Sequence, residues 1–257
     1  DFAVEEKPFN KKNLAIALFA AMFLTGAFAM TMVLLEIAFG RVRDFKELSY
    51  YSELNPIGEI PANDAVFENE AQKKTCWNEL FYRVQNQDFM KDLVFLAPLP
   101  GAALATDRLC DVFEWNYAVG GRRMLRLTIV PSMEFVEPSG SEPLGAVWIA
   151  DGRAVLPLEN PYLLSPSELQ LLTSDLAELR RTYDVVFIVL AAPLKLRGVF
   201  LGQMLQFCDC AILLLGEGTT SRHALRHVMN CNPKGKPFPS VFATGAKTLP
   251  FLAKGDA

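Results

Sequence analysis

The sequence is poor in the residue types that mark nucleic-acid-binding proteins and metalloenzymes. It has 25 lysine and arginine residues against 29 aspartate and glutamate residues, a formal net charge of −4 at pH 7. No basic run interrupts this balance, which argues against nucleic acid as a partner. There are two histidines. Neither a GxSxG nor an HExxH motif occurs, so serine-hydrolase and zinc-protease chemistry find no support.

Cysteine is also scarce, and its spacing is uninformative. The five cysteines form no CxxC pair, and a chain of this size does not need disulfides, so we expect reduced thiols in a cytoplasmic compartment. His223, His227 and Cys231 recur every fourth residue, which would place them on one helix face. No fourth ligand is evident and ordinary zinc motifs are spaced differently, so we expect no metal there.

One long stretch near the start of the chain contains no charge. Leu14 to Leu35 would span about 33 Å as a helix at about 1.5 Å per residue, enough to cross a bilayer. A signal peptide would be shorter and would end in small residues, and a buried helix of this length would keep a polar face. The stretch therefore predicts a transmembrane helix.

Flanking charge does not decide how this helix is oriented. Positive residues are equal in number at its two ends, with Lys7, Lys11 and Lys12 before it and Arg41, Arg43 and Lys46 after it. The reduced cysteines favour the cytoplasm for the residues after 40. Because the chain begins with aspartate, we expect it to be a piece of a longer protein whose preceding part lies across the membrane.

After residue 40, strand-like and helix-like patterns alternate. We expect a short helix capped by Asp44 and ended by Asn55-Pro56, an extended stretch to Pro61, and a polar linker from Ala62 to Lys74. The predicted strands are Leu93–Ala97, Met124–Val130, Val147–Ala150, Val185–Ala191, Ala211–Leu215 and Val241–Thr244. The predicted helices are Thr75–Gln87, Ala103–Val119, Pro166–Thr182, Val199–Phe207 and Thr220–Met229. The interval from Val130 to Ser165 is predicted to be mostly loop.

This alternation determines the predicted fold class. Near-continuous apolar strands separated by helices are typical of a parallel sheet covered on both faces. We therefore predict an α/β fold with a doubly wound parallel sheet, preceded by one transmembrane helix.

The first predicted core strand runs into the sequence VFLAPLPGAALAT, residues 94 to 106. A strand, a Pro/Gly turn and a helix start are the outline of a phosphate-binding loop. Leu104 stands where such a loop needs lysine. The next position, where such a loop has a hydroxyl that binds Mg²⁺, is Ala105, and Thr106 comes one residue later. The predicted vestigial loop comprises Pro100, Gly101, Ala102, Ala103, Leu104, Ala105 and Thr106. The alternative is an ordinary strand–helix turn that never bound nucleotide.

The order of these segments resembles the C-terminal part of the bacterial polysaccharide co-polymerases. These are inner-membrane chain-length regulators whose cytoplasmic domain is a tyrosine autokinase in one branch. Asn55 to Pro61 resembles the family's juxtamembrane pattern, Tyr183 to Ile188 resembles the approach to its Walker B aspartate, and Cys208 to Arg222 resembles the strand and turn that follow. The resemblance implies a P-loop-like domain in the cytoplasm, attached to the inner membrane.

The resemblance also implies four segments. Residues 1–13 would be an extracytoplasmic stub, 14–40 the transmembrane helix, 41–75 a juxtamembrane helix and linker, and 76–257 a degenerate P-loop kinase-like domain. A helix before the first core strand would carry glutamate and arginine residues that bridge subunits in a ring. Glu79 and Arg83 fit that role, and the alternative is a surface ion pair within the helix.

At the positions where the kinase branch has acidic residues, this sequence has none. Thr128 and Val130 stand where the family has an Asp-x-Asp pair, and Val189 and Leu190 where it has the Walker B aspartate. Asp184 lies at the other end of its strand, roughly 15–20 Å away at about 3.3 Å per residue. Phosphoryl transfer depends on lysine and Mg²⁺, so we predict no catalytic residue, no cofactor and no metal.

These departures shape the expected function. We expect a non-catalytic inner-membrane co-polymerase that regulates chain length, polymerisation and export of an exopolysaccharide or capsule. Its expected partners are further copies of itself, the polysaccharide polymerase and export machinery, and a separate kinase or phosphatase. The alternative is a divergent ATP-binding tyrosine autokinase that uses Thr106, Arg122 or Arg123. The absence of tyrosine after Tyr183 argues against that alternative.

Overall fold

The structure is a computed structural model of the chain. It describes residues 11–43, 45–48, 50–51, 54–61, 67, 69–86, 92–99, 102–137, 139–150, 152–191, 197–231 and 238–244. The chain divides into two units, Asp1–Gly40 and Arg41–Ala257, and each is described by itself.

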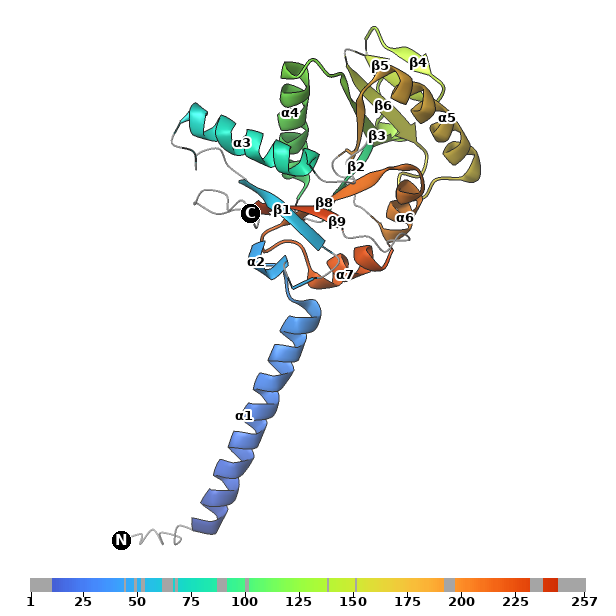
Figure 1. The fold of residues 1–257 in the computed structure, drawn as a ribbon. Coiled ribbons are helices and arrows are strands. Elements are labelled where there is room, and N and C mark those ends of the chain that lie inside the picture. Colours follow the sequence, from blue (N-terminus) through green and yellow to red (C-terminus); the bar gives the residue numbers. More distant parts are fainter. Residues whose placement is uncertain are drawn as a thin grey trace, which may run out of the picture. The chain divides into compact units, whose positions relative to one another are not determined.

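The first unit is the single helix α1 (Lys11–Phe39) (Figure 1). Its segment Leu14–Glu36 has a mean hydropathy of 2.2 and is long and apolar enough to cross a membrane. All side chains from 14 to 36 are exposed. Thr25 and Thr31 donate their hydroxyls to the carbonyls of Ala21 and Ala27 at 2.7 and 2.8 Å, so both polar groups are satisfied within the helix, as hydrocarbon surroundings require.

The second unit is built on a nine-stranded sheet of order β1-β9-β8-β2-β7-β3-β6-β5-β4 (Figure 1). Its strands are β1 (Leu54–Pro61), β2 (Leu93–Pro98), β3 (Met124–Pro131), β4 (Glu142–Leu144), β5 (Val147–Ala150), β6 (Arg153–Leu158), β7 (Val185–Leu190), β8 (Cys210–Gly216) and β9 (Phe238–Thr244). Neighbouring strands are parallel in the part of this order that runs β1-β9-β8-β2-β7-β3-β6. The β4 and β5 strands extend one edge in antiparallel fashion.

Helices cover both faces of the sheet (Figure 1). One face carries α3 (Glu70–Gln85) and α4 (Ala103–Val119), and the other carries α2 (Phe45–Leu48), α5 (Pro166–Thr182), α6 (Gly198–Phe207) and α7 (Arg222–Asn230). Val94 and Leu96 of β2 belong to the core under α3 and α4, whereas Phe95 belongs to the opposite core. Burial on both faces explains the continuous apolar strands and confirms the predicted doubly wound α/β fold.

The structure corrects three local predictions. The segment predicted as loop contains β6, which pairs in parallel with β3. Helix α3 starts at Glu70 rather than Thr75, because Asn69 caps it by accepting from the N–H of Gln72 at 2.8 Å, so the predicted linker is too long. The predicted juxtamembrane helix is also too long: it is the single turn α2, and the Asn55-Pro56 segment lies in β1.

Candidate functional site

The doubly wound topology singles out one edge of the sheet. The chain leaves β2 for β3 on one side, and it leaves β7 for β8 on the opposite side of β2. In open α/β sheets, ligands bind outside the carboxyl ends of the strands at such a reversal. The end of β2, the start of α4 and the ends of β3 and β7 therefore form the candidate site.

The start of α4 has backbone groups that could contact a ligand, and no side-chain cap is described there. Leu99 donates its N–H to Leu214 at 2.9 Å, and Ala102 donates to the carbonyl of Leu99 at 3.0 Å. Ala102 is the cap residue and makes no side-chain hydrogen bond. Leu104 lies in the first helical turn; its side chain and those of Ala103 and Ala105, together with all of Pro100 and Gly101, lie outside the described part.

Thr106 is the polar side chain that the predicted loop brings into this region. Its residue is 4% exposed, and its Oγ1 has no hydrogen-bond partner among the described atoms. A buried hydroxyl without a partner costs about 1–3 kcal/mol. Among the described side chains of the predicted loop, this hydroxyl is the candidate for the hydroxyl ligand of a Mg²⁺–nucleotide site, one residue after the expected position.

The predicted acidic positions lie together but hold no acid. Thr128 of β3 is the register partner of Val189 of β7, and Ile129 is the partner of Leu190. Val189 and Leu190 are 1% and 7% exposed. Neither a threonine hydroxyl nor an apolar side chain replaces a carboxylate as a Mg²⁺ ligand. The described residues therefore do not fit Mg²⁺–nucleotide.

Two aspartates on the elements of the site, Asp107 and Asp184, have partners within the domain. Asp107 of α4 forms an ion pair with Arg126 of β3, one residue beyond Thr106. Asp184 lies at the opposite edge of the sheet, where its carboxylate accepts from the N–H of Arg123 at 2.6 Å. Asp184 thus links the starts of β3 and β7 and lies away from the carboxyl edge of the sheet.

Two of the described cysteines, Cys76 and Cys110, are poor nucleophiles. Burial, with a smaller contribution from Glu79, raises the pKa of Cys76 to about 11. Burial also raises the pKa of Cys110, on α4, to about 12. Both thiols are protonated near neutral pH, and the thiolate is the reactive form. All five cysteines are free of disulfides.

Two features of the carboxyl edge were not predicted from the sequence. Arg197, the cap residue of α6, lies 4.4 Å from the ring centre of Tyr162. A hollow of about 610 Å³ opens between the ends of β3 and β6 and the start of α5. It is lined by Ser132, Pro157, Glu159, Asn160, Leu163, Ser165, Ser167 and Glu168. Periodicity could not reveal it, because its residues come from loops whose meeting depends on the unpredicted β6.

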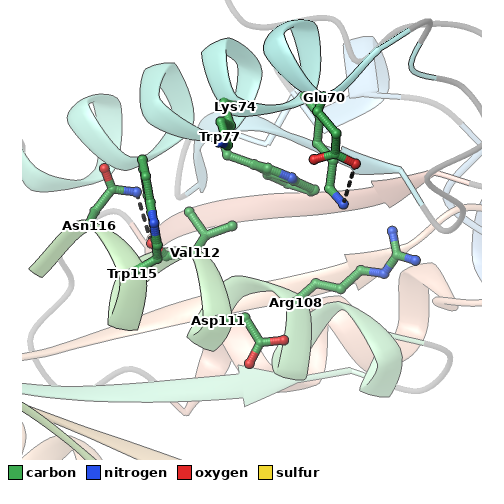
Figure 2. A pocket seen from close by; sticks show the side chains of 9 residues that line it. Glu70, Lys74, Trp77, Arg108, Asp111, Val112, Trp115 and Asn116 are labelled. Carbon is green, nitrogen blue, oxygen red and sulfur yellow. Dashed lines mark hydrogen bonds and ion pairs between the residues drawn. The ribbon is translucent and has the colours of Figure 1, made fainter. Parts of the chain in front are cut away.

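A second hollow of about 260 Å³ lies between α3 and α4. It is lined by Glu70, Lys73, Lys74, Trp77, Arg108, Asp111, Val112, Trp115 and Asn116. Trp115 lies toward one end and Arg108 and Glu70 toward the other, with the Trp77 ring between them (Figure 2). Trp77 is buried, whereas Trp115 is 46% exposed. The groove thus combines an aromatic end with a charged end.

The predicted subunit-contact pair lies on α3. Arg83 and Glu79 pair with each other at 2.9 Å along the helix, as the alternative of an intrahelical ion pair expected, and a role between subunits stays a prediction. His223 and His227 lie on α7 and Cys231 caps its end. No cluster of three or more His, Cys, Asp or Glu residues suited to a metal occurs within the described ranges.

Solved structures share this architecture. One is the BceF tyrosine kinase domain, at 15% identity and a TM-score of 0.53, covering 80% of this chain and 100% of that one. Another is the chimerical protein CapA2B2, at 12% identity and a TM-score of 0.52, covering 79% and 99%. No family model matches the sequence, and neither does any curated protein. The chain therefore shares the α/β fold of these structures, which include a tyrosine kinase domain.

Proposed function

We propose that this chain is a non-catalytic, membrane-anchored polysaccharide co-polymerase, in which a kinase fold serves as a scaffold. The observation that carries the proposal is the chemistry of the carboxyl edge. Where the fold would hold Mg²⁺ and phosphates, the described positions are Thr128, Val130, Val189 and Leu190, and the sequence has Leu104 in place of the P-loop lysine.

Electrostatics supports this proposal. Phosphoryl transfer relies on lysine and metal ions to neutralise charge on the transferred group, with little covalent chemistry from the protein. A site without the lysine and both acidic positions lacks the means to hold Mg²⁺–nucleotide as well as to turn it over. The thiols of Cys76 and Cys110 do not supply a substitute, since burial keeps them protonated.

The membrane and partner parts of the proposal rest on the architecture. The α1 segment from Leu14 to Glu36 is long and apolar enough to cross a membrane and is exposed over its whole length, which supports the proposed role as an anchor. The proposed location of the domain is the cytoplasmic side of the inner membrane. Further copies of this chain and the polysaccharide polymerase and export machinery are the proposed partners. In this role the domain regulates polymer length by assembly.

A divergent tyrosine autokinase is the second candidate, and one observation favours it. The Oγ1 of Thr106 is buried without a hydrogen-bond partner among the described atoms, one residue after the position of the Mg²⁺-binding hydroxyl in a phosphate-binding loop. The two candidates make opposite predictions for Thr106→Val, which removes this hydroxyl at nearly constant volume.

The test uses the full chain in membranes of a host that lacks its own copy. For a scaffold, Thr106→Val removes a buried, unpartnered hydroxyl, so the variant is at least as stable as the wild type and polysaccharide chain length is unchanged. Phosphotyrosine is absent after incubation of either purified protein with Mg²⁺–ATP. Phosphotyrosine that appears in the wild type and disappears in Thr106→Val would establish the autokinase instead.

A further inference from the structure

The end of helix α7 lies against the start of helix α6 (Figure 1), and a thiol and an imidazole come together there. We propose that Cys231 is a reactive thiol whose proton is taken by His227, and that it is oxidised by peroxide. This modification site does not depend on whether the domain binds nucleotide.

The two side chains meet over Gly198, the first residue of α6. A Cβ at this position would lie 2.5 Å from the Sγ of Cys231 and 2.8 Å from the Nε2 of His227. Both atoms are therefore close to one point, and the distance between them is at most the sum of these two distances. One water molecule or a change of side-chain rotamer can join a thiol and its base over such a gap. The missing side chain of Gly198 leaves the room that the pair occupies.

Helix α7 holds the pair in place. His227 and Cys231 are four residues apart, and side chains at this spacing are neighbours on a helix. Leu225 and Val228 are buried in the core, which fixes the direction of the helix. The N–H of Cys231 donates to the carbonyl of Val228 at 3.1 Å, so the thiol stays at the end of α7. The pairing thus follows from the packed position of the helix.

Small reagents can reach this pair. Cys231 is partly exposed and His227 is exposed. Three other cysteines, Cys110, Cys208 and Cys210, are buried. Exposure and a neighbouring base are the two conditions that select one thiol among several for reaction.

The start of α6 is a second favourable influence on this thiol. The cap residue of α6, Arg197, makes no side-chain hydrogen bond to the helix. The free N–H groups of a first helical turn carry a positive partial charge. This end of α6 therefore favours the negative charge that forms on the sulfur of Cys231 when the imidazole takes its proton.

The proposed step is a two-electron oxidation of the thiol. The Nε2 of His227 takes the thiol proton, and the sulfur attacks one oxygen of hydrogen peroxide. The S–O bond forms as the O–O bond breaks, and the leaving hydroxide takes the proton back from the imidazolium to become water. Cys231 becomes a sulfenic acid, which is a reversible level of cysteine oxidation.

The test uses the full chain in detergent micelles, treated with hydrogen peroxide near neutral pH. Dimedone traps sulfenic acid, and mass spectrometry gives the rate of trapping at each cysteine. Cys76 is the internal reference, because it is also partly exposed while burial raises its pKa to about 11. We expect Cys231 to react at least about tenfold faster than Cys76. In urea, where the fold no longer sets their surroundings, the two rates should converge.

Paired variants separate the imidazole from general effects on the helix. His227→Gln keeps a side chain of similar length but removes the base, and it is expected to slow the reaction of Cys231 about tenfold. His223→Gln makes the same change at another exposed position of α7, about 12 Å from Cys231 at about 1.5 Å per residue. It is expected to leave the rate within about twofold. Circular dichroism confirms that each variant is folded. Equal rates at Cys231 and Cys76 in the folded protein, or equal effects of the two variants, would overturn the proposal.

Discussion

The ion pair between Glu47 and Arg222 is expected to anchor the juxtamembrane segment to the domain. Glu47 of α2 binds the guanidinium of Arg222 at the start of α7, and it also accepts from the N–H of Arg43 at 3.0 Å. The perturbation is Glu47→Ala. It leaves the Arg222 side chain, only 18% exposed, without this carboxylate.

The expected cost follows from this degree of burial. A hydrogen bond to a charged group contributes about 1.5–3 kcal/mol, and breaking a fully buried pair costs about 3–5 kcal/mol. A pair that is mostly but not fully buried should therefore lose about 2 kcal/mol in the free energy of unfolding. For a unit of this size, that lowers the melting temperature by about 4–8 °C.

The assay is thermal and urea unfolding of residues 41–257, with hydrogen exchange at the amide of Val42. Glu178→Ala is the matched control, because its pair with Arg181 is 50% and 78% exposed and should be worth less than about 0.5 kcal/mol. The double variant with Arg222→Ala isolates the coupling energy. A coupling below about 0.5 kcal/mol, or no difference from the control, would refute this reasoning.

Two substitutions and one labelling experiment test the packing around the sheet. Gly145→Ala should lower the free energy of unfolding by about 2–4 kcal/mol, measured by denaturant unfolding. The φ of Gly145 is +57°, and a Cβ there would lie 2.1 Å from the Asp175 carboxylate. A loss below about 1 kcal/mol would contradict this close approach. Phe113→Ala should cost about 3–5 kcal/mol, since this fully buried ring packs against Phe187, and a near-neutral result would place the ring at the surface. Cys110, with a pKa of about 12, should react with a thiol reagent at pH 8 only on unfolding, and rapid labelling of the native protein followed by mass spectrometry would disprove its burial.

Local signals in the sequence were sufficient for the elements that carry them. The capping box of Ser165 and Glu168, with proline at the first helical position, begins α5 at the predicted residue. The all-apolar strands β2, β7 and β8 were also predicted, because burial on both faces leaves a continuous apolar run. Where one physical cause dominates a short segment, the sequence alone is enough.

Elements stabilised by distant contacts were harder to predict. In β6, Ala154, Leu156 and Leu158 are buried while the residues between them are not, and Pro157 within the run reads as a loop signal. Its pairing with β3 along one edge stabilises it as a strand. The same cause hid the hollow between β3, β6 and α5, since the connection after β3 has to meet the loop between β6 and α5 to form it.

The candidate site divides in the same way. Positions such as Thr128 and Val189 were assigned from segment order, and the structure makes them register partners on adjacent strands. The missing acids can be read from the sequence directly. That the Thr106 hydroxyl is buried without a partner depends on three-dimensional packing, which no spacing pattern encodes.

Calorimetric titration of residues 41–257 with ADP and ATP, with and without Mg²⁺, tests the central claim most directly. We expect no heat of binding and no shift in melting temperature at millimolar nucleotide, because positions 128, 130, 189 and 190 carry no carboxylate for Mg²⁺ and the sequence has no P-loop lysine. A dissociation constant below about 0.1 mM, or about −5.5 kcal/mol, would contradict it and show that the site binds nucleotide through other groups.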